Sequence, residues 1–487
     1  MRPRLRLLDD LLVDRIVDEA RTVLATLGVE LHDPEGRDLL LAHGATADAA
    51  GARLRIPEAL VEKALATAPR AFTLYDPAGN ATHDLSGDNV HFAPGSAAIR
   101  LLDPGVGALR PPRSADYVRY AKVVSGLPHL AAQSTAFVPS DVPAALSDSW
   151  RLFLSLLHCP KPVVTGAFTA EGFAVMRDLL LGVRGTDTAL RERPLALFTC
   201  CPTSPLAWSE ATGRNLLDCA RTGIPVEIVA VPLAGFLSPV TLVGTLVQGT
   251  AENLSGVVLH QLAAPGAPLL WGSSAAVFDI RSEGAATGAI ETAMLTSGMT
   301  EVGKRLGLPT QAYAGVSDAK QLDAQAGAES ASGALLAALA GVNSVSGPGL
   351  LELDNGFSIA KLVLDHELCG MALRLVRGVE PRDDFPALPL LGELLSEKHL
   401  LIARHTRRHL RQEITFPGPA IDRSGEARWR ADGAATLGAR AEREVERLVA
   451  AWAPPPLAAE ARGDLVRVME SAARRAGCDS LPAWESA

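Results

Sequence analysis

Short apolar runs alternate with helical segments from about residue 88 to residue 378, and this rhythm constrains the fold more than any other feature of the chain. Proline precedes many of the apolar runs, as at Pro162, Pro225 and Pro309. The pattern contains eight such pairs, each with the length of a β-strand followed by an α-helix. It therefore predicts an α/β protein, and eight units favour a closed (β/α)8 TIM barrel over an open doubly wound sheet.

Two nucleotide-binding motifs are absent from the sequence. No G-x-G-x-x-G follows the first strand, and no G-x-x-x-x-G-K-[ST] occurs anywhere. The patterns predict a small helical unit over residues 1–70 followed by short strands, and charged helices over residues 391–412, 434–452 and 457–477. Between these regions they predict a hairpin at residues 98–113 and a helix over residues 283–306, and the small residues of the predicted helices suggest close helix–sheet approach. We therefore predict three regions: an N-terminal helical and short-strand extension (1–87), the barrel (88–378) and a C-terminal helical region (379–487).

Composition excludes several classes of protein. The chain has 487 residues, 48% of them hydrophobic, and a formal net charge of −9, which argues against nucleic acid as the main partner. No apolar run reaches the roughly 18 residues that a membrane span needs, and the first residues do not resemble a signal peptide. Six cysteines form no C-x-x-C pair. We expect reduced thiols in a cytoplasmic protein.

One strand end carries a dense polar cluster. The predicted strand Pro309–Gly315 is followed within fifteen residues by Ser317, Asp318, Lys320, Asp323, Gln325 and Glu329. Ligands of α/β proteins bind at the carboxyl ends of strands, so we predict a functional site here. Asp318 is the candidate catalytic residue, which either faces a cationic substrate or orders the loop that covers it. The alternative is a capped helix start with a solvated loop.

Other predicted strand ends supply the candidate substrate-binding residues, which are Phe168, Phe236, Trp271, Tyr313, Gln325 and Glu352. Only 5% of the chain is aromatic, so four aromatic residues at strand ends are notable. Aromatic faces attract cations, and quaternary ammonium groups above all. The alternative is that these rings simply fill the top of the barrel.

Three further patterns give weaker evidence for a functional site. His405 and His409 stand one helical turn apart with His399 nearby, a spacing that can place two imidazoles on one metal ion. The residues between them are Thr-Arg-Arg, without a catalytic glutamate, so a helix surface or a structural contact is favoured and no metal site is predicted. Cys200 has no evident basic partner that would make it a nucleophile, and no G-x-S-x-G elbow appears.

Several of these stretches together resemble the trimethylamine:corrinoid methyltransferase superfamily, from about residue 10 to residue 475. The stretches are Phe92-Ala93-Pro94-Gly95, Thr203-Ser204-Pro205-Leu206, Pro309 to Gly315, Ser317 to Lys320 with Asp323 to Gly327, and His405 to His409 continuing to Asp422-Arg423. The resemblance implies a (β/α)8 barrel that is often oligomeric. It also implies methyl transfer from a methylated amine to the cob(I)alamin of a separate small corrinoid protein.

The founding members of that superfamily use pyrrolysine, whereas this chain has only standard residues. The resemblance therefore favours quaternary amines such as glycine betaine over trimethylamine. A quaternary nitrogen already carries the charge of a leaving group, so caging and orientation would suffice. We predict a corrinoid-dependent amine methyltransferase whose cobalamin is carried by a partner protein, and a homo-oligomer. The alternatives are a non-catalytic barrel that binds a methylated amine or a partner protein and, more remotely, a metal-dependent hydrolase.

Overall fold

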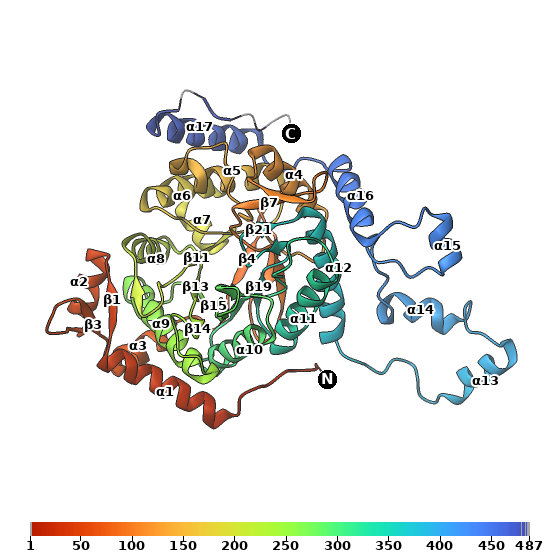
Figure 1. Cartoon of the computed structure of the whole chain (residues 1–487), viewed down its shortest axis with the longest axis horizontal. Helices are drawn as coiled ribbons and strands as arrows, with labels where there is room; N and C mark the ends of the chain where they lie inside the picture. Colours follow the sequence, from red (N-terminus) through yellow and green to blue (C-terminus); the bar gives the residue numbers. More distant parts are fainter. Residues whose placement is uncertain (1, 479, 483, 485–487) are drawn as a thin grey trace.

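Eight parallel strands form the centre of the described part of the chain, which in this computed structural model comprises residues 2–478, 480–482 and 484. They run in chain order through the interior of the ring of helices visible in Figure 1. They are β6 (His91–Ala93), β9 (Gln133–Ser134), β10 (Val163–Thr165), β11 (Ala196–Cys200), β13 (Val226–Ala230), β15 (Leu269–Ser273), β18 (Gln311–Tyr313) and β19 (Ser344–Ser346).

The strands pair in two parallel sheets that meet at both edges. One sheet has the order β15-β13-β11-β10-β9, and the other has the order β18-β19-β6. Isolated parallel bridges join Trp271 to Thr310 and Phe92 to Leu130, which link β15 to the start of β18 and β6 to the chain just before β9. The strand order therefore follows the chain order, as the sequence pattern predicts for consecutive β/α units.

A helix follows each of these strands, so the predicted alternation is confirmed. The eight helices are α4 (Ser114–Ser125), α5 (Ser147–His158), α6 (Ala170–Arg184), α8 (Glu210–Thr222), α9 (Leu242–Ala263), α10 (Ile290–Arg305), α11 (Ala324–Ala340) and α12 (Ile359–Val376). A short extra helix, α7 (Asp187–Glu192), follows α6. The pattern succeeds because each apolar run is bounded by residues that start or stop a helix.

Local sequence explains where the helices begin and end and how closely they pack. Asp323 caps α11 by accepting a hydrogen bond from the Ala326 amide at 3.0 Å, and Gly341 ends the helix with a φ of 77°. Glycine inside a helix allows close approach: a Cβ on Gly256 of α9 would lie 2.7 Å from the Trp208 ring. The small residues of these helices thus serve helix–sheet packing, as expected from the sequence.

Residues 1–70, predicted as a small helical unit, also contain strands. The helices are α1 (Asp10–Thr26), α2 (Pro34–Ala42) and α3 (Glu58–Thr67), and the strands are β1 (Val29–Leu31), β2 (Thr46–Ala47) and β3 (Arg53–Arg55). The prediction was wrong here because these strands are two or three residues long, too short for a periodic pattern. Their pairing is tertiary instead, since β1 pairs in parallel with β12 (Ala207–Trp208).

A hairpin covers the amino-terminal end of the strand ring. It consists of β4 (Thr73–Tyr75) and β5 (Ala81–Asp84). Leu74 and Leu85 pack in one buried cluster with strand residues that include Leu197 and Leu270. The Tyr75 amide also donates a hydrogen bond to the Pro194 carbonyl, just before β11 begins. The hairpin thus fills this end of the ring with apolar side chains.

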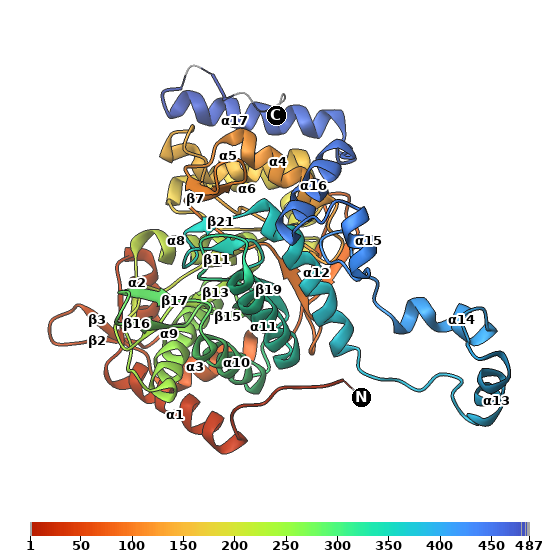
Figure 2. The same ribbon diagram turned by 45° about the vertical axis from the view of Figure 1, so that its right-hand side comes forward.

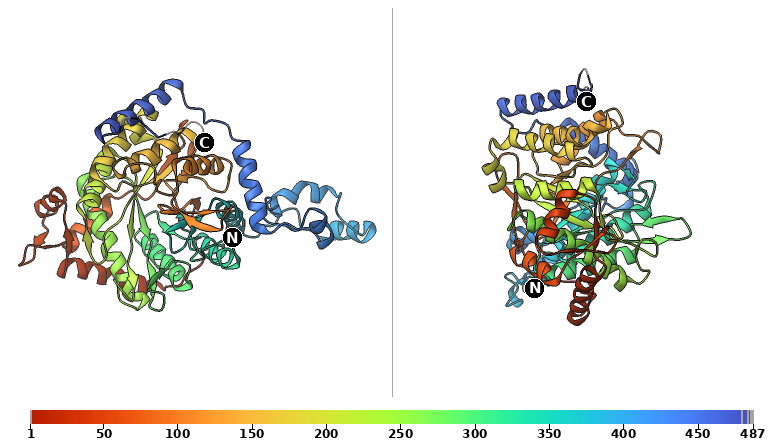
Figure 3. Two further views of the ribbon diagram at one scale, coloured as in Figure 1. Left: turned by 45° about the horizontal axis from the view of Figure 1, so that its top comes forward. Right: turned by 90° about the vertical axis from the view of Figure 1, so that its left-hand side faces the viewer.

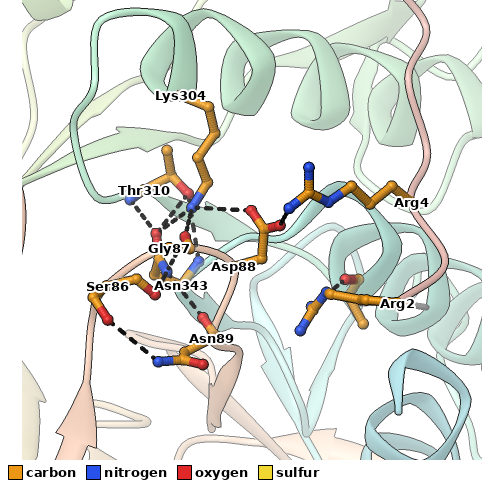
Figure 4. A network of polar contacts seen from close by, with 10 residues as sticks. Arg2, Arg4, Ser86, Gly87, Asp88, Asn89, Lys304, Thr310 and Asn343 are labelled. Atoms are coloured by element: carbon orange, nitrogen blue, oxygen red, sulfur yellow. Dashed lines mark hydrogen bonds and ion pairs between the residues drawn. The ribbon is translucent and has the colours of Figure 1, made fainter. Parts of the chain in front are cut away.

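A polar network secures the chain beside this hairpin (Figure 4). The Asn343 amide donates hydrogen bonds to the Gly87 and Asn89 carbonyls at 3.1 and 2.9 Å. Its oxygen accepts one from the Lys304 ammonium at 2.6 Å. Asp88 forms an ion pair with Arg4 of the N-terminal segment at 2.5 Å. Burial lowers the pKa of Lys304 to about 8.

Short hairpins extend from the strand ends opposite this network. The predicted hairpin at residues 98–113 is confirmed as β7 (Arg100–Asp103) and β8 (Ala108–Arg110). β14 (Leu233–Ala234) pairs with β16 (Ala276–Asp279), which also pairs with β17 (Gly284–Ala286). The helix predicted from Glu283 was therefore wrong in its first turns, because residues 284–286 are held as a strand by β16. The last of these hairpins is β20 (Leu350–Leu351) with β21 (Gly356–Phe357).

In the described part of the chain five helices follow α12, and α13, α14 and α15 project from the body of the molecule (Figures 1 and 2). The five are α13 (Leu388–Glu397), α14 (Arg404–Glu413), α15 (Glu426–Ala431), α16 (Leu437–Ala450) and α17 (Ala459–Arg475). α17 returns to cover α5 and α6, as both views of Figure 3 show. α13 and α14 lie at the end of the projecting arm. The single helix predicted over 391–412 is wrong, because Lys398 adopts a left-handed φ of 63° and ends α13.

Among the helices of the described residues, none combines the length and the apolar character that crossing a membrane requires.

Candidate active site

Glu227 is a carboxylate on the inner face of the strand ring. It lies in β13, opposite Thr199 of β11 and Leu270 of β15, and Leu270 packs with the hairpin that fills the ring. Its side chain is 0% exposed. The Thr199 hydroxyl donates a hydrogen bond to Oε1 at 2.6 Å, whereas Oε2 has no partner. Burial raises the pKa of Glu227 to about 7.

Tyr313 and Gln311 bring β18 to the same interior. They are two residues apart and so share one face of the strand. The Tyr313 hydroxyl lies 3.2 Å from the Ser96 hydroxyl, after β6, and both burial and the nearby Glu227 charge raise the pKa of Tyr313. The Gln311 oxygen accepts a hydrogen bond from the Ser273 amide at 3.3 Å, while its buried nitrogen has no partner. Unpaired polar atoms thus face inward from two strands.

Asp318 fastens the loop before α10 to the loop after β18. Its Oδ1 accepts hydrogen bonds from the Thr287 amide at 3.0 Å and the Thr287 hydroxyl at 2.7 Å. Its own amide donates to Glu329 of α11 at 2.9 Å. Burial, followed by the charge of Glu329, raises the pKa of Asp318. Asp318 thus holds two loops and the start of α11 together.

Asp354 enters from the β20–β21 hairpin. Glu352, Leu353 and Asp354 have positive φ values of 50°, 56° and 66°, an unusual succession for residues with a Cβ. Burial, followed by the charge of Asp318, raises the pKa of Asp354 to about 7, and its Oδ1 has no hydrogen-bond partner. The strained turn therefore holds a carboxyl group close to that of Asp318.

The three carboxyl groups of Glu227, Asp318 and Asp354 lack a cationic side-chain partner. Within the described residues, none of them forms an ion pair with lysine or arginine. A pocket of about 170 Å³ opens beside Tyr313, between α10 and α11; Thr287 and Glu329 line it, whereas the three carboxyl groups lie outside its lining. The site thus combines buried carboxyl groups with an aromatic ring, a combination that suits a small organic cation.

The remaining predicted aromatic residues lie elsewhere. Trp271 points outward, since its indole N–H donates a hydrogen bond to the Met299 carbonyl of α10 at 3.0 Å. Phe168 is 62% exposed and lies under the Arg151 guanidinium, and Phe236 stacks on Phe278 with ring centroids 4.8 Å apart. Among the four predicted aromatic residues, Tyr313 is the one that the structure places with the carboxyl groups.

The two remaining polar candidates make contacts on the outside of this group. Gln325 is exposed on α11 and donates a hydrogen bond to Glu329 at 2.9 Å. Glu352 forms an ion pair with Arg100 at 2.9 Å, while its second oxygen is buried without a partner. Both lie next to residues of the site, Gln325 through Glu329 and Glu352 through the turn that carries Asp354.

Sequence reasoning did not select Glu227, Gln311 or Asp354. Glu227 carried a signal, because a single carboxylate interrupts the otherwise apolar strand Val226–Ala230. Buried carboxylates are rare unless they are paired or functional. Gln311 similarly stands between Thr310 and Ala312 in a buried strand. The position of Asp354 depends on a turn conformation that the sequence pattern does not predict.

Fold and site together define an α/β protein with buried carboxyl groups on and after its parallel strands, next to Tyr313. The sequence matches the profile of the trimethylamine methyltransferase (MTTB) family over residues 1–476. The chain belongs to this family of methyltransferases, and the resemblance stated from its motifs is confirmed.

Individual relatives agree with the family assignment. The chain is 29% identical over 451 residues to the trimethylamine methyltransferase MttB of Desulfitobacterium hafniense (strain DSM 10664 / DCB-2), covering 92% of this chain and 90% of the relative. It is 28% identical over 461 residues to the glycine betaine methyltransferase of Desulfitobacterium hafniense (strain Y51), covering 93% and 94%.

Among solved structures, the monomethylamine methyltransferase MtmB of Methanosarcina barkeri has the same fold. It superposes with a TM-score of 0.53 at 10% identity, covering 91% of this chain and 89% of that one. A structure of the hydroxylamine MtmB complex gives a TM-score of 0.54 at 10% identity, with 97% and 88% coverage.

Proposed function

We propose that this chain transfers a methyl group from a small quaternary or tertiary amine, such as a betaine, to the cob(I)alamin of a separate corrinoid protein. The observation that carries the proposal is the group of carboxyls Glu227, Asp318 and Asp354, which have raised pKa values and no cationic side-chain partner. A permanent organic cation supplies the missing counter-charge. The glycine betaine methyltransferase among the relatives supports the choice of substrate class.

Each residue of the site has a role in this proposal. Glu227 and Asp354 hold the ammonium by charge, and Tyr313 offers its ring face to the methyl groups. Asp318 keeps the Thr287 loop in place over the pocket. The cobalt(I) of the bound corrinoid supplies the nucleophile, so the protein needs no general base. The task of the chain is then to exclude water, hold the cation and orient one methyl group toward the opening.

The carboxyl ends of the strands offer a surface that fits such a partner. Large apolar side chains are exposed on the loops that follow β6, β10, β13 and β15, namely Ile99, Val106, Phe168, Phe236, Val240 and Ile280. Exposed apolar side chains gathered around one opening mark an interaction surface. We infer that the corrinoid protein docks here, over the site that holds the amine.

The same inference extends to the architecture. We infer that the eight parallel strands close into a (β/α)8 barrel, which the two edge bridges and the eight following helices support. We also infer a cytoplasmic homo-oligomer. The six free cysteines suit a reducing compartment, and α13 has no buried residue in the isolated chain. Light scattering that shows a monomer at micromolar concentration would contradict the oligomer.

The experiment is methyl transfer to free cob(I)alamin with the purified chain. Glycine betaine, choline and trimethylamine are supplied separately, and methylcob(III)alamin is followed by absorbance. We expect transfer from at least one quaternary amine and a loss of transfer in Glu227→Gln. The alternative function, a non-catalytic binding protein, predicts amine binding by calorimetry without any methylation, either with free cob(I)alamin or with a corrinoid protein.

A further inference from the structure

The projecting arm carries a cluster of metal-type donors far from the site described above (Figures 1 and 2). Asp383 lies in the segment before α13, and His405 and His409 lie one turn apart on α14. Residues at positions i and i+4 share one face of a helix, so both imidazoles can reach the same point. Asp383 lies on the other side of α13 in the sequence, so no helical spacing relates it to the two histidines.

The three side chains converge on one carboxylate oxygen. Asp383 Oδ1 lies 3.1 Å from His405 Nδ1 and 2.6 Å from His409 Nε2. One ligand atom from each residue lies within 4.8 Å of the other two. The imidazoles pack edge to face, with centroids 5.0 Å apart. Two nitrogens and one oxygen therefore surround a point that a single ion can occupy after a small rearrangement of the carboxylate.

His409 is the buried member of the cluster. The residue is only 9% exposed, and its Nε2 faces the Asp383 carboxylate. An imidazole nitrogen and a carboxylate oxygen held side by side, away from water, offer two adjacent ligand atoms to one ion. Asp383 is held from its other side, because the Arg408 guanidinium lies 3.5 Å from Oδ2. That contact leaves Oδ1 free to face the imidazoles.

We propose that Asp383, His405 and His409 form a binding site for a late first-row divalent cation, with Zn²⁺ as the reference ion. Imidazole nitrogen with carboxylate oxygen is a donor set that suits zinc, cobalt, nickel and copper and not magnesium or calcium. Three protein ligands leave a position for water or another donor. The sequence alone favoured a surface or structural contact for the histidines, because Thr-Arg-Arg lies between them; Asp383, twenty-two residues upstream of His405, gave no sign of its proximity.

The ion would serve the arm itself. Asp383 precedes α13 and His405 follows it, so coordination closes the loop that contains this helix. α13 has no buried residue among those described, and Leu388, Leu391 and Leu395 on it are exposed. Its position therefore depends on how firmly its two ends are held together. A metal clip across them restricts the unclosed conformations of the arm, as a crosslink does.

The test is metal binding by the full-length protein after treatment with a chelator. Zn²⁺ is titrated in competition with a chromophoric chelator, and Co²⁺ is added separately to record its visible absorption. We expect one ion per chain. His405→Ala and Asp383→Asn are each expected to weaken binding by about tenfold or more, because even the loss of an outer-shell partner costs about that much. Hydrogen exchange in α13 is expected to slow when Zn²⁺ is added.

The matched control is His399→Ala, since His399 is exposed on the same arm and lies outside the cluster. It is expected to bind Zn²⁺ like the parent protein. Three results would each overturn the proposal: no stoichiometric ion, equal weakening by His399→Ala and His405→Ala, or no effect of Asp383→Asn. The last result would leave a simple contact between two histidines and an acid. Circular dichroism of each variant verifies that the body remains folded.

Discussion

Replacing Glu227 by glutamine removes a buried charge with almost no change in shape. The Thr199 hydroxyl donates to Oε1 at 2.6 Å, and a glutamine oxygen can accept the same hydrogen bond. A carboxylate and an ammonium about 5 Å apart attract each other by about 3 kcal/mol at an effective dielectric constant of about 20. Loss of that attraction corresponds to about two orders of magnitude in the dissociation constant of a quaternary amine.

The same substitution is expected to stabilise the protein without ligand. The pKa of Glu227 is raised from 4.5 to about 7, so its contribution to stability is fully present below pH 4.5 and is lost as the pH rises through about 7. That difference corresponds to about 3 kcal/mol at pH 8. A neutral glutamine avoids the cost. Glu227→Gln should therefore bind substrate more weakly and unfold at a higher denaturant concentration than the parent protein.

Calorimetry with a betaine and chemical denaturation at pH 8 measure the two effects. Glu252→Gln is the matched control, because Glu252 is equally buried but accepts hydrogen bonds from Ser204 and the Leu206 amide outside the site. Its substitution should leave amine binding unchanged and lower stability, because both Glu252 oxygens accept hydrogen bonds and the glutamine amide nitrogen cannot accept one of them. The reasoning is refuted if Glu227→Gln weakens amine binding less than about threefold, or if it destabilises the protein as Glu252→Gln does.

Three further predictions use other residues. Asp318→Asn should lower the rate of methyl transfer at least about tenfold, equivalent to about 1.4 kcal/mol, because it disturbs the Thr287 loop or the bound cation. Unchanged transfer kinetics would show that the acid is structural. Amine affinity should rise about tenfold between pH 6 and pH 8 as Glu227 ionises, and a pH-independent dissociation constant would contradict its assignment. Lys361→Met should lower the free energy of unfolding in urea by about 3–5 kcal/mol, because it leaves the buried Asp365 carboxylate, 2.6 Å from the ammonium, without its partner. Adding Asp365→Leu to this variant should recover most of the lost stability.

The alternation of strands and helices could be predicted because each unit carries its own boundaries. Proline precedes several of the apolar runs, and α11 begins after its cap Asp323 and ends at Gly341. The face that each residue presents could not be predicted in the same way. A strand that is buried on both sides is apolar throughout, so its sequence does not show which residues point inward. Trp271 therefore faces α10 although it was expected in the pocket.

The site was recovered in part for a related reason. Asp318 and Tyr313 follow or end one strand and share a continuous stretch of sequence, so local reasoning could find them. Glu227 and Asp354 come from β13 and from a left-handed turn, and their charges both act on Tyr313 because of how the whole set of strands is arranged. Asp383 and His409 illustrate the same limit in the arm, where the helix between them brings distant residues together.

The hairpin β4–β5 has a consequence for the order of events during turnover. Leu74 and Leu85 seal one end of the strand ring, so the substrate must use the opposite end both to arrive and to depart. The proposed methyl acceptor, the corrinoid protein, covers that same opening. The amine must then bind before the acceptor docks, and the demethylated product leaves only after the acceptor dissociates. Such a compulsory sequence makes an excess of acceptor protein an inhibitor, because it occupies the entrance of an enzyme that has not yet been loaded.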